Sequence, residues 1–334
     1  MIEVADSADT ASLVREVEIL GEKLGLVRQA VGRVIFGQDL VVEQSLITLL
    51  AGGHVLLVGV PGLGKTRLVE TLGTVLGLDA KRVQFTPDLM PADILGSEVL
   101  DEDAQGRRAF RFIRGPVFCQ LLMADEINRA SPRTQSALLQ AMQEHKVAVG
   151  GEIHALPAPF HVLATQNPIE QEGTYPLPEA QLDRFLLEVQ VTYPDAAAER
   201  TMLLATTGVR EAPAVMAMTA DDLMAAQRLI RRMPVGEAVL NAILKLVRGA
   251  RPETSDLGMV RQHLAWGPGP RAAQALMLAT RARAVLDGRL APSVEDVLAL
   301  ADPVLRHRMA LNFSARAEGV TLADIIAALK AEVG

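Results

Sequence analysis

The sequence predicts an α/β fold with a parallel five-stranded sheet, followed by a helical second region. Short apolar runs alternate with helical patterns over residues 54–189, as expected for right-handed βαβ units. After Tyr193-Pro194 only helical patterns occur. In addition, the first apolar run leads directly into a glycine-rich loop that opens a helix. These three observations together favour a nucleotide-binding α/β domain with a helical domain behind it.

The first region begins with two helical patterns. Apolar residues at helical spacing predict a helix over 12–34, a loop at 35–38 and a second helix over 39–51. The second helix ends at Gly52-Gly53, where a helix terminus favours glycine. Further helices are expected at 64–77 and 133–144. Continuous apolar runs, typical of buried parallel strands, predict the five strands at 54–58, 81–85, 120–124, 161–165 and 185–189.

The chain of 334 residues has the length of about two domains. We place the first at 1–194 and the second at 195–334. The second is expected to be entirely helical, with an irregular stretch marked by Gly267-Pro268-Gly269-Pro270. Its helical patterns cover residues 195–208, 219–231, 235–248, 270–287, 292–311 and 320–333.

Two segments interrupt the alternation of strands and helices. Residues 97–113 read as a β-hairpin with a turn around Ala104-Gln105-Gly106. Residues 146–156 read as a second hairpin, because Gly150-Gly151 separates two short alternating runs. Both are insertions that the sheet itself does not need.

Composition excludes several classes of protein. Hydrophobic residues make up 49% and charged residues 22%, which argues against a disordered chain. The net charge of −7 disfavours a general nucleic-acid binder. The single cysteine, Cys119, permits no internal disulfide. No secretory signal is visible, and glycines and Pro61 break the uncharged stretch 44–64, so we expect a cytoplasmic protein without a membrane span.

A phosphate-binding loop is the most specific motif. Residues 59–66 fit the pattern G-x-x-x-x-G-K-[ST], between a predicted strand and a predicted helix. The glycines let backbone N–H groups surround phosphates at the helix N-terminus. Lys65 would reach the β- and γ-phosphates, and the Thr66 hydroxyl would bind Mg²⁺. The expected nucleotide-binding residues of this loop are Gly59, Val60, Pro61, Gly62, Leu63, Gly64, Lys65, Thr66 and the following Arg67.

Two acidic residues end the third predicted strand. Parallel α/β sheets place ligands at the carboxyl ends of their strands, and Asp125 and Glu126 follow an apolar run there. Asp125 suits Mg²⁺, partly through water. Glu126 suits the role of general base for the attacking water. Alone, such an acidic pair is more often a solvated strand end. Beside a phosphate-binding loop, it specifically indicates a site for nucleotide hydrolysis.

Three further polar residues are candidates for the same chemistry. Asn167 ends the next strand and can orient the attacking water, although an Asx turn before Pro168 would also explain it. Arg184 precedes the fifth strand and can act as an arginine finger on a neighbouring subunit, or else form a surface pair with Asp183. Arg271 opens a helix of the second region and either contacts phosphate or is simply solvated.

Together these elements resemble the AAA+ ATPases over residues 12–333. In that family's terms, 59–66 is similar to Walker A, Asp125-Glu126 to Walker B and Asn167 to sensor 1. Arg184 resembles the arginine finger, and Arg271 resembles sensor 2, acting either on its own subunit's nucleotide or across the interface. Residues 35–38, with Gly37 and Gln38, resemble the segment beside adenine. The hairpins and the strings at 86–93, 125–130, 164–168 and 177–185 resemble the MoxR group within that family.

The MoxR resemblance implies a P-loop αβα domain and a helical lid that bind ATP and Mg²⁺ between them. It also implies ATP hydrolysis that drives remodelling, maturation or activation of partner proteins. The implied assembly is a homo-oligomeric ring, commonly a hexamer, with Arg184 completing the neighbour's site. The implied partners are protein clients and a protein with a von Willebrand factor A-type domain.

Three other functions stay open at this point. A nucleic-acid-dependent motor would also use hairpins, and Arg107, Arg108, Arg111 and Arg114 lie near one of them. A magnesium-chelatase-like ATPase subunit would need its own partner subunits. A non-catalytic, nucleotide-gated scaffold ranks last, because Glu126 and Arg184 are both present.

Overall fold

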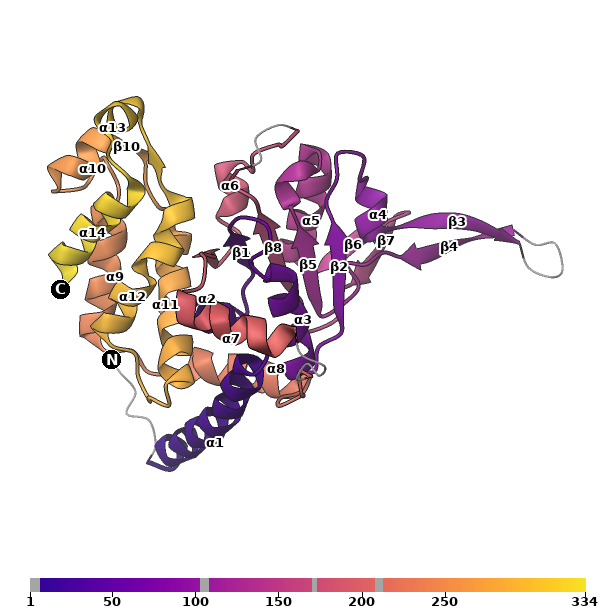
Figure 1. The fold of residues 1–334 in the computed structure, drawn as a ribbon, viewed down its shortest axis with the longest axis horizontal. Helices are drawn as coiled ribbons and strands as arrows, with labels where there is room; N and C mark the ends of the chain where they lie inside the picture. Colours follow the sequence, from indigo (N-terminus) through magenta and orange to yellow (C-terminus); the bar gives the residue numbers. More distant parts are fainter. Residues whose placement is uncertain (1–6, 103–107, 170–172, 208–212) are drawn as a thin grey trace.

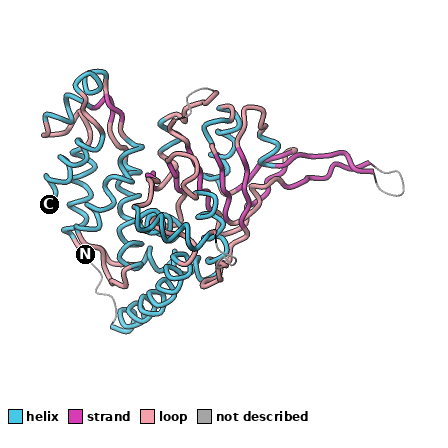
Figure 2. Tube along the Cα trace, in the orientation of Figure 1, coloured by secondary structure: helices cyan, strands magenta, loops and turns pink. Residues whose placement is uncertain are grey.

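A computed structural model describes residues 7–102, 108–169, 173–207 and 213–334. Its centre is a parallel sheet with strand order β2–β5–β8–β1–β9, which confirms the predicted fold class (Figures 1 and 2). The glycine-rich loop follows β1, next to the centre of the sheet. The strands are β1 (Val55–Val58), β2 (Ala80–Gln84), β5 (Leu121–Asp125), β8 (His161–Gln166) and β9 (Leu187–Gln190).

Helices cover both faces of this sheet. Because successive strand residues point to opposite faces, Val55 and Leu57 pack into one hydrophobic core and Leu56 into another. The first core contains helices α1, α2 and α3, and the second contains α5. Ser131 caps α5 by accepting a hydrogen bond from the Thr134 N–H. These helices are α1 (Ser7–Gly32), α2 (Asp39–Leu50), α3 (Lys65–Val75) and α5 (Pro132–Glu144).

The two predicted hairpins are present. Strands β3 (Gly96–Glu102) and β4 (Arg108–Arg114) project far from the body of the molecule (Figure 1). The turn expected at 104–106 lies outside the described residues. Strands β6 (Lys146–Val149) and β7 (Glu152–Ala155) form the second hairpin. Its Gly150 and Gly151 have φ of 60° and 85°, as a tight two-residue turn requires.

The second region is helical, but the expectation that it contains only helices is wrong. Strands β10 (Leu264–Trp266) and β11 (Ala310–Leu311) form a short antiparallel ribbon. The predicted helix 292–311 therefore ends early, and its last residues turn inward to contact the sheet domain. The helices are α7 (Ala196–Thr206), α8 (Ala220–Arg232), α9 (Glu237–Gly249), α10 (Gly258–His263), α11 (Pro270–Leu286), α12 (Val294–Leu305), α13 (Phe313–Glu318) and α14 (Leu322–Val333).

Several short elements escaped the sequence pattern. Helices α4 (Pro91–Leu95), α6 (Glu179–Leu182), α10 and α13 are each too short to show a clear helical period. The same holds for the one-turn helices η1 (Ile127–Arg129) and η2 (Arg306–Arg308). Two of these short elements, η1 and η2, contribute to the sites described below.

The helical region shares a core with the sheet domain. The core around α1, α2 and α3 continues into α8, α9, α11, α12 and α14, and α11 packs against both α2 and α8. The helical region therefore lies against the sheet domain as a lid (Figure 1). Within the described part of the chain, no helix has the length and apolar character needed to cross a bilayer.

Candidate functional site: two cavities at opposite edges of the sheet

The glycine-rich loop joins the end of β1 to the start of α3. Gly62 and Gly64 have φ of 84° and 75°, and a Cβ atom built on either would meet nothing within 4 Å. The loop thus adopts a left-handed backbone that favours glycine, beneath open space. Lys65 Nζ donates hydrogen bonds to the Gly59 carbonyl and, at 3.2 Å, to the Val60 carbonyl. Residues 59 and 60 therefore position the lysine.

The loop forms one wall of a cavity of about 400 Å³. The sequence-predicted Asp125, Glu126 and Asn167 lie on the other walls, at the carboxyl ends of β5 and β8. We call this the phosphate-loop cavity. Burial lowers the pKa of Lys65, while Asp125 and Glu126 act in the opposite direction. Its lining residues are Pro61, Gly62, Leu63, Gly64, Lys65, Thr66, Arg67, Asp125, Glu126, Thr165 and Asn167.

Asp125 is buried and held from two sides. Its Oδ1 accepts a hydrogen bond of 2.6 Å from the Thr165 hydroxyl. Its Oδ2 accepts bonds of 3.1 and 2.6 Å from Arg82 Nε and Nη2. Arg82 comes from the neighbouring strand β2, so the sheet itself brings a compensating charge to this carboxylate. Both partners fix the direction of the Asp125 carboxylate.

Glu126 has an unusual backbone conformation for its residue type. Its φ is 55°, a strained value that persists mainly where function requires it. Its N–H donates to Thr165 Oγ1 at 2.8 Å. Its carboxylate Oε2 accepts bonds from Gln84 Nε2 at 2.8 Å and Arg129 Nη1 at 3.1 Å. The carboxylate is therefore oriented by β2 on one side and by η1 on the other.

Asn167 forms the Asx turn considered from the sequence, and it also lines the phosphate-loop cavity. Its Oδ1 accepts a hydrogen bond of 3.1 Å from the Ile169 N–H, which is the expected Asx turn. The same side chain lines the phosphate-loop cavity. Because the turn uses its oxygen, its NH₂ group is the end that can donate to a ligand in the cavity.

A second cavity of about 370 Å³ adjoins the other side of the glycine-rich loop. Ile35, Phe36 and Gln38, from the segment that we expect beside adenine, line this cavity. Gly37 does not line it; its left-handed turn, φ 66°, packs closely against Pro194 and Ala198 instead. The residues that sequence reasoning missed here are Val34, Tyr193, Pro194, Glu199, Met202 and Thr206.

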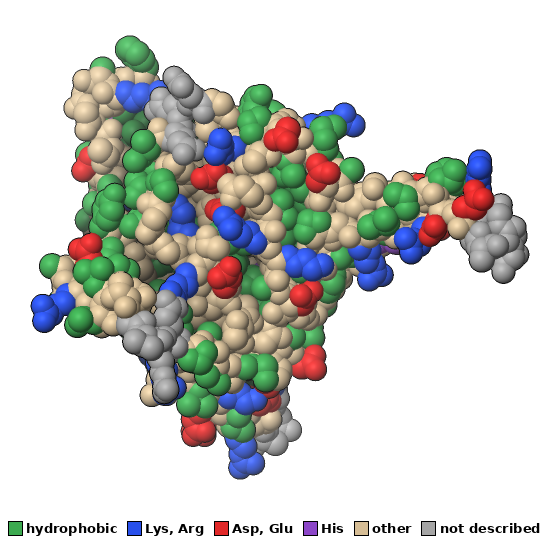
Figure 3. Space-filling view, turned by 45° about the vertical axis from the view of Figure 1, so that its right-hand side comes forward, with side chains coloured by type: hydrophobic (Ala, Val, Ile, Leu, Met, Phe, Trp, Pro, Cys, Tyr) green, Lys and Arg blue, Asp and Glu red, His purple; other side chains and the backbone are tan. Residues whose placement is uncertain are grey.

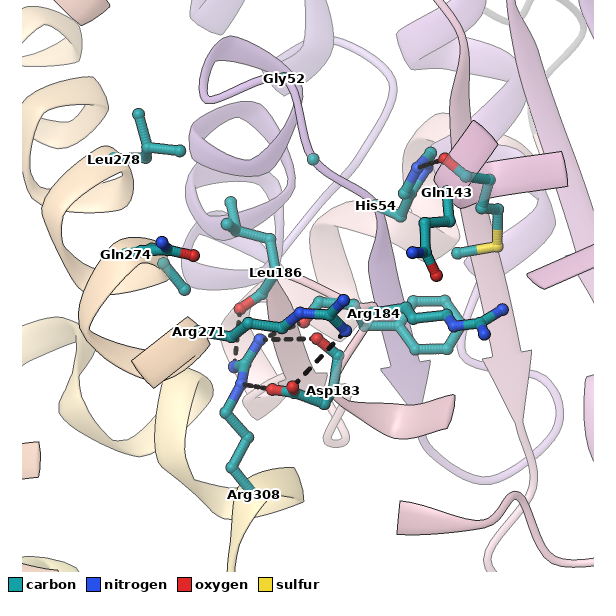
Figure 4. Close-up of a pocket in the computed structure, with 14 residues that line it drawn as sticks. Gly52, His54, Gln143, Asp183, Arg184, Leu186, Arg271, Gln274, Leu278 and Arg308 are labelled. Carbon is teal, nitrogen blue, oxygen red and sulfur yellow. Dashed lines mark hydrogen bonds and ion pairs between the residues drawn. The ribbon is translucent and has the colours of Figure 1, made fainter. Parts of the chain in front are cut away.

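Arg184 and Arg271 lie elsewhere, together, in a cavity of about 260 Å³ (Figure 4). We call this the arginine cavity. Its walls include Gly52, Gly53 and His54 before β1, and Asp183 to Leu186 before β9. These segments precede their strands, whereas the phosphate-loop cavity follows its strands. The two cavities therefore lie at opposite edges of one parallel sheet: the phosphate-loop cavity at the carboxyl ends of the strands, and the arginine cavity at their amino ends.

The surface pair considered for Arg184 is not what the structure contains. Asp183 instead pairs with two lid residues, Arg308 at 2.7 Å and Arg271 at 3.7 Å (Figure 4). Burial, followed by the neighbouring charge of Arg271, lowers the pKa of Arg184. Two guanidinium groups thus lie close together, and Asp183 is already engaged by Arg308. Such an arrangement favours a further anion.

Four polar residues of these sites had no sequence signal of their own. Arg82, Gln84 and Arg129 were hidden because neighbouring strands and a one-turn helix bring them to the acidic pair. Thr165 was read as an ordinary strand residue. The alternation of side chains along β2 offered one usable signal. Arg82 and Gln84 lie two residues apart in this strand and therefore point to the same face of the sheet.

Comparisons with known proteins agree with this geometry. Residues 54–187 match the ATPase family associated with various cellular activities (AAA), and residues 258–329 match the AAA lid domain. Chaperone MoxR1 of Mycobacterium tuberculosis is 43% identical over 87% of this chain and 76% of its own. Protein MoxR of Paracoccus denitrificans is 32% identical over 90% of this chain and 92% of its own.

Similarity also extends to a solved structure. The crystal structure of a candidate ATPase from Cytophaga hutchinsonii has a TM-score of 0.88 and 36% sequence identity. The match covers 96% of this chain and 97% of that one. Both the sheet domain and the lid are therefore shared. The chain belongs to the MoxR family of AAA+ ATPases.

Proposed function

We propose that this protein hydrolyses ATP in a ring and uses the energy to remodel, mature or activate partner proteins. One observation carries the proposal. The phosphate-loop cavity holds Lys65, Thr66, Asp125, Glu126 and Asn167, but Arg184 and Arg271 lie at the opposite edge of the sheet. Within one chain, Arg184 and Arg271 therefore lie apart from the nucleotide site. A second copy supplies what the first lacks.

The residues of the phosphate-loop cavity fit Mg²⁺-ATP. Among the described residues, no group of three or more His, Cys, Asp or Glu could bind a metal ion by itself. Magnesium suits such a site, because it takes one or two protein oxygens and completes its shell with phosphates and water. Thr66 and Asp125 would supply those oxygens. When bound, Mg²⁺ would neutralise charge that develops on the phosphates.

The remaining roles follow from position. Lys65 would contact the β- and γ-phosphates, with the backbone N–H groups of the loop around them. Glu126 would take the proton of the attacking water, and Asn167 would hold that water by its NH₂ group. The second cavity, with Gln38 and Arg67, would hold the adenine and ribose. We place the division between nucleotide domain and lid after residue 194.

The ring follows from how two unlike surfaces combine. Contact between the phosphate-loop edge of one copy and the arginine edge of the next is a heterologous interface, and such an interface generates a ring when the rotation between copies closes. Arg184, with Arg271 beside it, would then reach the neighbour's γ-phosphate. We propose a hexamer, and we assign Arg271 to the interface rather than to its own subunit's nucleotide.

The projecting hairpins support protein clients. Leu100 and Phe110 face each other across β3–β4 and are 56% and 72% exposed. Apolar side chains displayed this far from the core are typical of a surface that binds other proteins. We propose protein clients in the cytoplasm and a partner with a von Willebrand factor A-type domain, in line with the chaperone name of the M. tuberculosis relative.

Two arginines of β4 are paired with acidic residues, which does not favour nucleic acid. Arg108 pairs with Glu102 at 3.0 Å, and Arg111 pairs with Asp101 at 3.1 Å. Figure 3 shows acidic and basic side chains side by side along this hairpin. Phosphate binding needs a surplus of positive charge. DNA-stimulated hydrolysis would revive the motor alternative, and constant co-purification with other subunits would revive the chelatase-like one.

Glu126→Gln tests the proposed chemistry. The amide keeps the shape but accepts no proton, so ATP binding should persist while phosphate release falls about 10²- to 10⁴-fold. Lys65→Ala should weaken binding itself. Glu70→Gln, an exposed position on α3, is the matched control and should behave as wild type. Unchanged hydrolysis in Glu126→Gln, measured with nucleotide affinity, would contradict the assignment.

A second experiment tests the link to clients. Replacement of 100–110 by a short Gly-Ser turn removes Leu100 and Phe110 with the end of β3–β4 and leaves the five-stranded sheet intact. Basal ATP hydrolysis should persist, and stimulation by an added client or partner protein should be lost. A fall in basal hydrolysis in a folded protein would give the hairpin a structural role instead.

A further inference from the structure

Arg308 is the most completely bonded charged side chain in the contact between lid and sheet. It comes from the one-turn helix η2, and it is only 2% exposed. All five of its N–H groups have acceptors. Two go to Asp183: Nε donates to Oδ1 at 2.7 Å, and Nη2 donates to the carbonyl at 3.4 Å. The others reach the carbonyls of Phe185, Leu186 and Val304.

These acceptors surround one residue. Asp183 precedes Arg184, and Phe185 and Leu186 follow it, so Arg308 binds the chain on both sides of Arg184. His307 adds a bond of 3.1 Å from Nε2 to the Phe185 carbonyl. Asp183 also lies 3.7 Å from Arg271, by its other carboxylate oxygen. One buried guanidinium therefore binds the chain on both sides of Arg184 and the carboxylate that lies beside Arg271.

We propose that Arg308 is a positioning residue that fixes Arg184 and Arg271 for the neighbouring subunit's nucleotide. This inference rests on the proposed role of Arg184 in the ring. Because Arg308 belongs to the lid and Arg184 to the sheet domain, a shift of the lid would move the finger. Arg308 touches nothing in the phosphate-loop cavity. Its loss should therefore impair the subunit that donates the finger, and not the subunit that binds the nucleotide.

Arg308→Lys is the most informative substitution. Lysine keeps the charge and most of the volume but offers at most three donors without the planar fork, so carbonyls around Arg184 lose their partners. Displacement of a catalytic group by about 1 Å can cost roughly 10²-fold in rate. We expect a fall of that order in ATP turnover with ATP affinity unchanged. Arg306→Lys is the matched control: it lies on the same helix and pairs locally with Asp302.

Mixing experiments separate positioning from a general structural role. The reference mixture is Arg184→Ala with Glu126→Gln, in which the second protein donates a finger to the first. Arg308→Lys mixed with Glu126→Gln should recover activity like the reference, because its own nucleotide site is intact. Arg308→Lys mixed with Arg184→Ala should stay inactive, because neither protein donates a well-placed finger. Co-assembly of each pair is verified by pull-down of a tagged subunit.

The outcomes distinguish this inference from the proposed function. An inactive reference mixture, with subunits assembled, contradicts the role of Arg184 itself. Suppose that the reference mixture recovers activity but the mixture of Arg308→Lys with Glu126→Gln stays inactive. The Arg308→Lys defect then includes its own nucleotide site, which contradicts a positioning role for Arg308. Wild-type turnover in Arg308→Lys also contradicts it. If Arg308→Lys does not assemble, Asp183→Asn replaces it in the same mixtures. Asp183→Asn should fail to complete a neighbour's site while its own nucleotide site still works. Wild-type turnover in Asp183→Asn overturns the inference.

Discussion

The phosphate-loop cavity and the arginine cavity differ in how the fold builds them. The first gathers residues that follow strands β1, β5 and β8, all at one edge of the sheet. The second combines residues that precede β1 and β9 with the end of α5 and two lid segments, around Arg271 and Arg308. Sheet geometry alone fixes the first, whereas the second exists only where the lid meets the sheet.

We assign a different task to each cavity: nucleotide binding to the first and completion of the neighbour's site to the second. Nucleotide binding depends on a rigid edge, where Thr165 and Arg82 hold Asp125. In the ring that we propose, completion of the neighbour's site would depend on the lid, through Arg308 and Asp183. The position of the lid in one subunit would then control the chemistry in the next. Substitutions in the two cavities should have different signatures, and the following predictions test that contrast.

The largest expected effect belongs to the arginine cavity. Arg184→Ala should leave ATP affinity nearly unchanged, since Arg184 lies outside the phosphate-loop cavity. Turnover should fall steeply, because an arginine supplied in such reactions contributes roughly 10³- to 10⁵-fold. Nucleotide binding and phosphate release measure the two properties separately. Arg316→Ala, an exposed arginine on α13, is the control. Loss of ATP affinity in Arg184→Ala would remove the distinction between the cavities.

Lowering the pH should reduce the free energy of unfolding, because two histidines at or near the arginine cavity are buried in their neutral form. Burial lowers the pKa of His54, which lines the arginine cavity, to about 3, and that of neighbouring His161 to about 4. His54 accepts a bond from the Val162 N–H, and His161 Nε2 accepts one from Gln227 Nε2 at 3.1 Å, so both rings are held neutral. The nearby His145 also disfavours their protonation.

The sign of the pH effect follows from these lowered values. Between pH 6.5 and about 4 the unfolded chain binds protons at these histidines and the folded chain does not, so stability falls as pH falls. At pH 5 each histidine should lower the free energy of unfolding by about 2 kcal/mol relative to pH 7.5. Urea unfolding at the two pH values measures this. His54→Asn should reduce the difference, and an equal difference in that variant would refute the explanation.

A smaller effect is expected at Thr165. Its hydroxyl donates to Asp125 and accepts from the Glu126 N–H, so it connects the two acidic residues. Thr165→Val keeps the shape and leaves the partly buried Glu126 N–H without its partner, which costs about 1 kcal/mol of stability. Turnover should drop about tenfold through misplaced carboxylates. Thr48→Val, at a buried hydroxyl on α2, controls for loss of a hydroxyl alone. Equal turnover in both variants would exclude the connecting role.

The contrast also explains what could be predicted from sequence. The phosphate-loop cavity was predictable because each of its parts is a short contiguous pattern: an apolar strand, then Gly59 to Thr66, or an apolar strand, then Asp125-Glu126. Parallel strands bring such ends to one edge whatever the rest of the chain does. The five strands and both hairpins were predictable for the same reason, since local period and turn residues determine them.

The arginine cavity was only half predictable. Arg184 and Arg271 were found by resemblance, but their common location depends on contacts between residues more than 80 positions apart. Arg308 gave no signal at all, because it falls in a stretch that continues a helical pattern, and only the inward turn of η2 reveals its role. The ribbon β10–β11 was missed similarly, since strands of three and two residues carry too little period to detect.

The central claim is that one subunit's arginine cavity completes the next subunit's phosphate-loop cavity. The most direct test is to mix Arg184→Ala and Glu126→Gln proteins over the full range of ratios and measure ATP turnover per subunit. Each protein alone should be nearly inactive. With random assembly, turnover should rise to a maximum at equal amounts, about a quarter of the wild-type rate, because a productive head-to-tail contact needs one subunit of each kind. A turnover that stays at the level of the inactive parents at every ratio, with subunits shown to co-assemble, would contradict the account.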